Sequence, residues 1–157
     1  MGNVGHLVSR VLSPRLRRSR MAPSRDAATQ RDDFILLHTL EEKFLPGVIA
    51  SYAAPNLPAV LSSVAETTHR VNEYWEKHRE APGRGNPLYF ALEYVRLLSI
   101  VLRPLLPVAA SRLHSYFPHS QQNFSFLKTG FLTNRHAYTA YTKAAKPFVL
   151  PPHLSGR

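Results

Sequence analysis

The feature that most constrains this 157-residue chain is a run of apolar residues from Asn86 to Phe117. Between Pro87 and Pro104 apolar side chains recur at every helical spacing, so they cover nearly the whole circumference of a helix. A helix of this kind must be buried in the middle of a bundle. Pro87 suits its first turn, where the missing N–H would be unpaired anyway, and Pro104 ends it. Pro107 then opens another helix.

Three more helices are predicted before this run. The second is expected to begin with Asp32 or Asp33 as its N-cap, and Pro46 with Gly47 should cause a kink or break near Leu45. Its apolar stripe comprises Phe34, Leu37, Leu40, Phe44 and Val48.

The third helix is expected to have Asn56 as its N-cap, and Trp75 falls on its apolar stripe, so Trp75 is predicted to be a core residue. The predicted fold is all-α, a bundle of about five helices near 3–12, 33–52, 57–80, 87–103 and 107–117.

Residues 1–117 are predicted to form one helical domain. Within it, residues 13–31 are rich in Pro, Arg, Ser and Ala without periodicity, and they are expected to be a basic loop. Residues 118–157 contain spaced aromatics, no acids and no clear period. They are predicted to form an irregular tail packed on the bundle.

The positive charge is strong and unevenly distributed. The formal net charge is +10, with −4 in residues 26–93 and +14 in the two ends together. Such a surplus needs an anionic partner, with nucleic acid first and an acidic membrane surface second. Apolar runs are shorter than the roughly 18–20 residues of a membrane span, so no span is expected.

No enzymatic motif is present in the sequence. The chain has no cysteine, which excludes disulfides, thiolate catalysis and cysteine-based zinc sites. It also lacks the P-loop, GxSxG and HExxH patterns. The pairs His69 with His78 and His114 with His119 do not have metal-ligand spacing. No catalytic residue, metal site or cofactor is therefore predicted.

Several stretches resemble the anticodon-binding domain of methionyl-tRNA synthetases, which are class I aminoacyl-tRNA synthetases. NVGHLVSRVLS is similar to the NLGNLVSRVLS type of start, AVLSSVAETTHRVNEY to the third helix, and ALEYVRLLSIVLRPLLPVAASRL to the penultimate helix and its proline corner. KPFVLPP stands where members often carry a KPxPLFPR type of segment. The HIGH-type and KMSKS-type signatures are absent, so the resemblance implies the anticodon-binding fold without the catalytic domain.

The resemblance also implies where RNA would be contacted. In that family an Asn and, four residues on, an Arg of the first helix contact anticodon bases, and a Trp after the third helix stacks on the anticodon. Here His6 and Arg10 stand at the first two positions. Ala81-Pro82 is followed by Gly83, and the only tryptophan, Trp75, lies inside the preceding helix. Two of the three positions therefore differ from the family.

Five arginines are predicted to contact RNA. Arg10 keeps the guanidinium needed for bidentate contact with a base edge or a phosphate. The other four form a dense basic run that repels itself unless phosphates neutralise it: Arg15, Arg17, Arg18 and Arg20. With His6, they are the predicted RNA-binding residues.

Residues 1–25 have two interpretations. They are rich in Arg and Ser and free of acids, as mitochondrial presequences are. Alternatively, their first part is already a folded helix of the domain. The Arg-rich start predicts a mitochondrial location, with the cytoplasm as the alternative.

Three hypotheses for function follow. The first is a non-catalytic tRNA-binding module in methionine aminoacylation, acting as part of a methionine–tRNA ligase or beside a synthetase catalytic chain. The second is a structural subunit of the mitochondrial ribosome, with ribosomal RNA and ribosomal proteins as partners. The third is a helical adaptor between proteins, whose basic ends are incidental.

Overall fold

In the computed structural model, residues 2–12, 31–80 and 85–117 are described. Within them the chain forms helices and no strand, which confirms the predicted all-α class. The elements are α1 (Gly2–Val11), α2 (Arg31–His38), the π-helical segment η2 (Thr39–Phe44), α3 (Leu45–Ala53), α4 (Leu57–His78), α5 (Gly85–Val101) and α6 (Pro107–His114). None of these helices is long and apolar enough to cross a membrane.

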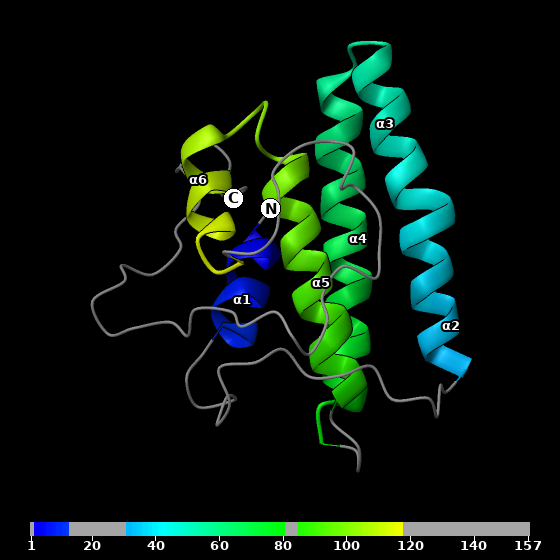
Figure 1. Cartoon of the computed structure of the whole chain (residues 1–157). Coiled ribbons are helices and arrows are strands. Elements are labelled where there is room, and N and C mark those ends of the chain that lie inside the picture. The colour runs from blue at the N-terminus through cyan, green and yellow to red at the C-terminus, as the bar shows by residue number, and fades with distance from the viewer. Residues whose placement is uncertain (1, 13–30, 81–84, 118–157) are drawn as a thin grey trace.

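The helices pack around α5. In Figure 1, α5 lies between α4 on one side and α1 with α6 on the other, and α2, η2 and α3 line the outer side of α4. Every residue from Tyr89 to Leu102 is buried, which confirms the prediction of a helix enclosed on all sides. The predicted loop and tail, 13–31 and 118–157, lie outside the described residues except for Arg31, which begins α2.

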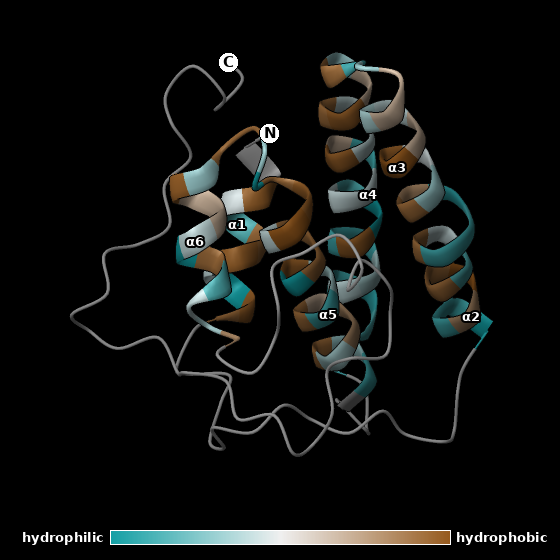
Figure 2. Ribbon diagram, turned by 45° about the horizontal axis from the view of Figure 1, so that its top comes forward, coloured by the Kyte–Doolittle hydropathy of each residue, from teal (hydrophilic) through white to brown (hydrophobic). Residues whose placement is uncertain are grey.

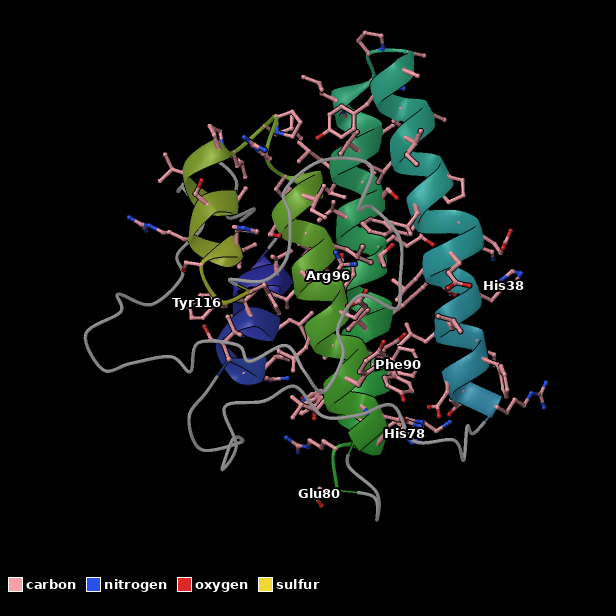
Figure 3. All side chains as sticks on the ribbon, viewed as in Figure 1. His38, His78, Glu80, Phe90, Arg96 and Tyr116 are labelled. Carbon is pink, nitrogen blue, oxygen red and sulfur yellow. The ribbon has the colours of Figure 1, made fainter. Side chains whose placement is uncertain are left out.

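The helix enclosed in this way also buries charge. Glu93 and Arg96, one turn apart on α5, are each 1% exposed, and Arg96 Nη2 donates to Glu93 Oε1 at 2.7 Å. A second bond from Arg96 Nε to Glu93 Oε2, at 3.1 Å, makes the contact bidentate. Figure 3 labels Arg96 midway along α5. Each charge is neutralised by the other inside the core, so neither is buried without an ion-pair partner.

The irregularity expected near Leu45 is a π-helical turn, and the backbone does not leave the right-handed helical region there. The N–H of Leu45 donates to the carbonyl of Leu40, five residues back. Pro46 explains this widening: it has no N–H to offer Glu42, and its ring would crowd that carbonyl in a regular α-helix. Helices α2 and α3 thus continue into each other through η2. Figure 2 shows hydrophilic residues at the start of α2, mixed hydrophilic and hydrophobic bands along it, and a mostly hydrophobic α3.

Two expectations for the start of α2 are wrong. The helix begins at Arg31, so Asp32 and Asp33 lie in its first turn and not at its N-cap. Phe34 was expected in the core and is 56% exposed. The inward position belongs to Asp33, whose carboxylate accepts hydrogen bonds from other helices, so the buried stripe runs through Leu36 and Leu40 instead.

The N-cap of α4 and the proline corner between α5 and α6 lie where the sequence predicts them. Asn56 caps α4, and its Oδ1 accepts from the N–H of Ala59 at 3.1 Å. After Val101 the chain turns through the corner and restarts at Pro107. The hydroxyl of Tyr52 on α3 donates to the carbonyl of Val101 at 2.6 Å, which ties the end of α5 to α3.

Candidate nucleic-acid interface

Helix α1 is amphipathic: one face is buried and the other is exposed. Its apolar side chains are completely buried against α4 and α5: Val4, Leu7, Val8 and Val11. This confirms that the start of the chain is a folded helix of the domain. His6 and Arg10 lie one turn apart and are both exposed. The geometry therefore brings together these two predicted RNA contacts on one surface of α1.

Arg10 does not stand alone on that surface. Its Nη1 donates to Glu76 Oε1 on α4, and the Arg10 and Glu76 side chains are 46% and 42% exposed. The other oxygen, Glu76 Oε2, forms an ion pair with Nε of Arg79 at 3.3 Å. We call these three residues the Arg10–Glu76–Arg79 triad. One carboxylate thus lies between two guanidinium groups, and the triad keeps one net positive charge.

The sequence did not indicate Glu76 or Arg79 as part of the site. Arg10 and Glu76 are 66 positions apart, so no local spacing connects them. The signal that was available is the resemblance itself, because it assigns RNA contact to the first helix and to the segment after the third helix, and Glu76 and Arg79 lie just before that segment.

Trp75 precedes Glu76 and points the other way. It is 5% exposed, which confirms its prediction as a core residue. Its indole is therefore not presented to a base. Of the remaining predicted contacts, Arg15, Arg17, Arg18 and Arg20 lie outside the described residues.

The charge of the described helices is balanced. Residues 2–12, 31–80 and 85–117 contain nine Lys or Arg and nine Asp or Glu. The whole surplus of ten positive charges therefore belongs to the sequence outside these ranges. The helical body offers single contacts such as the triad, and it does not by itself form a strongly positive surface.

A second polar cluster joins α2, α4 and α5 at the end of the bundle where α4 stops. Asp33 is buried and accepts from the hydroxyl of Tyr74 and, at 3.0 Å, from Nδ2 of Asn86. Burial, with the Asp33 carboxylate beside it, raises the pKa of Tyr74 far above its ordinary value. Since these groups satisfy one another, we assign them to holding the three helices together.

The neighbouring Asp32 forms an ion pair at the edge of the same cluster. Lys77 Nζ lies 2.7 Å and His78 Nε2 2.9 Å from Asp32 Oδ2. Hydrogen bonds from Lys77 and then from His78 hold the pKa of Asp32 below its ordinary value. Figure 3 shows His78 beside the start of α2.

A groove of about 200 Å³ lies between α2 and α4 next to this cluster. Its lining includes Asp32 and Glu73 as well as Arg70 and Lys77, so the charges cancel. Arg70 is bound to Glu66 at 3.0 Å and Lys77 to Asp32, which leaves neither cation oriented toward a ligand. The groove is therefore a weaker candidate than the α1 surface.

The histidines do not assemble a metal site among the described residues, where no group of three potential His, Cys, Asp or Glu ligands occurs. His69 contacts Glu73 at 3.3 Å, and His78 contacts Asp32. Burial, and then the charge of Arg103, lowers the pKa of His114. His119 lies outside the described residues.

Solved structures of a methionyl-tRNA synthetase share this fold. The apo form of the Mycobacterium tuberculosis methionyl-tRNA synthetase matches with a TM-score of 0.75 and 19% identity, over 95% of this chain and 32% of that chain. The same enzyme bound by methionyl-adenylate matches with a TM-score of 0.75 and 20% identity, over 89% and 30%. The chain thus spans about a third of the synthetase, and the resemblance seen in the sequence is confirmed as a likeness of fold.

Neither a protein-family model nor a curated protein matches the sequence.

Proposed function

We propose that this chain is a non-catalytic RNA-binding module that binds tRNA and contributes to methionine aminoacylation beside a separate catalytic unit. The observation that carries the proposal is the likeness of fold, which takes in 95% of this chain and only 32% of a methionyl-tRNA synthetase. The matched part is too short to include a whole synthetase, and the sequence lacks nucleotide-binding signatures. RNA binding is therefore the part of the synthetase's work that such a chain can share.

The distribution of charge supports a division of RNA binding between two parts of the chain. Because the described helices are neutral overall, phosphate attraction has to come mainly from the basic sequence outside them. Among that sequence is the predicted cluster Arg15, Arg17, Arg18 and Arg20. The exposed surface of α1, with His6 and Arg10, would supply the base contacts.

A second candidate is a structural RNA-binding subunit of the mitochondrial ribosome. Two observations favour it. The only tryptophan, Trp75, is buried inside α4 and does not stand after the third helix, where the family has its stacking tryptophan, and Arg10 is already bound to Glu76. A protein with these changes would bind RNA without depending on the anticodon. The mitochondrial location rests on the Arg-rich, acid-free start of the sequence.

The test is a binding titration of methionine initiator tRNA against the same tRNA with its CAU anticodon replaced, at several salt concentrations. A role in aminoacylation predicts clearly weaker binding after the swap. Arg10→Ala should remove that difference, and Arg112→Ala, an exposed arginine on α6, should keep it.

A ribosomal role predicts equal binding of the two tRNAs and co-purification with ribosomal RNA. Absent binding, or binding that does not weaken with salt, would contradict both functions.

A further inference from the structure

The outer side of α2, η2 and α3 exposes apolar side chains. Phe34, Ile35 and Ile49 are each about half exposed, and they are three of the five large apolar residues that are exposed within the described ranges. Helical spacing places them on one side of the segment 31–53, opposite the side that packs on α4. We call this surface the outer α2–α3 strip; its exposed residues include Phe34, Ile35, Glu42, Pro46, Ile49 and Ala53. An apolar surface of this kind is typical of an interaction site.

The groove of about 200 Å³ between α2 and α4 borders this strip. Ile35 belongs to both, and Leu36 and Tyr74 add buried apolar surface to the groove. The charged side chains along the groove already have partners on neighbouring side chains: Arg70 on Glu66, Lys77 on Asp32 and Glu73 on His69. The groove therefore suits an uncharged side chain, and an aromatic ring would bury the most apolar area in it.

The strip lies on an acidic side of the molecule. The segment 31–53 contains two basic and four acidic residues, a net charge of −2: Arg31, Lys43, Asp32, Asp33, Glu41 and Glu42. The described residues of α1, of the corner after α5 and of α6 include no acid and three arginines: Arg10, Arg103 and Arg112. In Figure 1 these two sides lie across α5 from each other. A basic apolar segment is therefore attracted to the strip and repelled from the α1–α6 side.

We propose that the segment 118–157 of this same chain docks on the outer α2–α3 strip and places an aromatic side chain in the groove. This segment contains five Lys or Arg, no acid and six Phe or Tyr. It thus has both properties that the strip selects, a positive charge and large apolar side chains. The charge explains why it occupies this strip and not the nearer surface of α6.

The connection between segment and strip favours this occupant over a separate molecule. An extended chain advances about 3.3 Å per residue, so the segment can reach about 130 Å from the end of α6. Because strip and segment belong to one chain, the segment is present at an effective concentration of about the millimolar range, and any other partner has to displace it. The exposed side of α1 stays open for RNA when the strip is occupied.

The first experiment places a photoreactive phenylalanine analogue, p-benzoylphenylalanine, at position 34 of the full chain without RNA. Leu57 carries the same probe in the control, because it is also an exposed apolar residue and lies about 20 Å from Arg70 along α4. Isotope-labelled and unlabelled chains are mixed before irradiation, and the crosslinked peptides are identified by mass spectrometry. The probe at position 34 should crosslink to peptides from 118–157 of the same molecule, and the probe at position 57 should not.

The second experiment measures cleavage by chymotrypsin, which cuts after aromatic residues and reaches them only when the segment leaves the strip. Phe34→Ser with Ile35→Ser removes two half-exposed apolar contacts, so cleavage within 118–157 should become about tenfold faster. Glu42→Lys weakens the attraction of exposed charges and should accelerate it by about two- to fivefold. Leu57→Ser is the matched control and should leave the rate unchanged. Melting temperatures of all variants should stay near the parent's, because every replaced side chain is exposed.

Each possible result decides the question. Crosslinks between labelled and unlabelled chains would mean that a second copy covers the strip, and this would overturn the proposal. A probe at position 34 that does not crosslink to 118–157 would overturn it as well, and so would an unchanged cleavage rate in the double serine variant. None of these measurements uses RNA, so the RNA-binding function and the docking of this segment succeed or fail separately.

Discussion

Replacing Leu98 by alanine should lower the free energy of unfolding by about 2–5 kcal/mol. Leu98 lies in α5 and is 0% exposed, with α5 enclosed by helices on several sides. Alanine has the best helix propensity, so the loss comes from packing alone. Removing three carbons costs about 2.4 kcal/mol at about 0.8 per buried group. A residual cavity of about 50–100 Å³ would add about 1–2.5 kcal/mol, which places the expected value in the upper half of the range.

The assay is thermal and urea unfolding followed by far-ultraviolet circular dichroism. A cost of about 1 kcal/mol lowers the melting temperature by about 2–4 °C in a chain of this size, so the expected drop is about 7–20 °C. Val108→Ala is the matched control, because Val108 is 68% exposed on α6 and should change stability by less than about 0.5 kcal/mol. If Leu98→Ala melts within a few degrees of the parent, α5 is not the buried centre of the fold.

Three further changes test the polar interior and its edge. Tyr94→Phe should cost about 1–2 kcal/mol in urea titration, because the buried hydroxyl donates to a carbonyl of α4; an unchanged midpoint would contradict that bond. Glu93→Ala should cost about 3–5 kcal/mol, since the Arg96 charge stays buried without this carboxylate; a loss below about 1 kcal/mol would argue against the buried ion pair. Hydrogen bonds from α4 lower the pKa of Asp32 from 3.8, so its stabilisation is complete above about pH 4 and is lost as the pH falls further. Asp32→Asn should therefore lose less stability than the parent between pH 6 and pH 3, and an equal loss would refute this assignment.

How far the sequence predicts the fold depends on whether the signal is local. Prolines and an N-cap fixed the ends of α4, α5 and α6 to within a few residues, because each acts on its own turn of helix. Which side of α2 faces the core was not predictable from such local signals. Asp33 turns inward because Tyr74 and Asn86 bind it, and these partners are 41 and 53 positions away. Because Asp33 faces inward, the adjacent Phe34 faces solvent although its side chain is apolar.

The candidate site shows the same limit. The spacing of His6 and Arg10 predicted a shared surface, and the helix provides it. The carboxylate that binds Arg10 comes from another helix, and one sequence gives no sign of the pairing. The buried ion pair on α5 was also missed, although Glu93 and Arg96 have the spacing for it.

If the neutral helical body selects a base and the basic flanking sequence supplies affinity, these two properties should respond to different substitutions. Replacing four arginines by alanine removes positive charge outside the described helices and leaves the triad intact: Arg15, Arg17, Arg18 and Arg20. Binding of all single-stranded RNAs should weaken alike, and the salt slope should flatten by up to about 3, at about 0.7 for each phosphate that is no longer neutralised. The preference between the initiator tRNA and its anticodon-swapped form should stay as in the parent, because Arg10 is unchanged on the exposed face of α1. A variant that loses the preference together with the slope would show that the basic run and α1 contact RNA as one surface, and the division between affinity and selectivity would then be wrong.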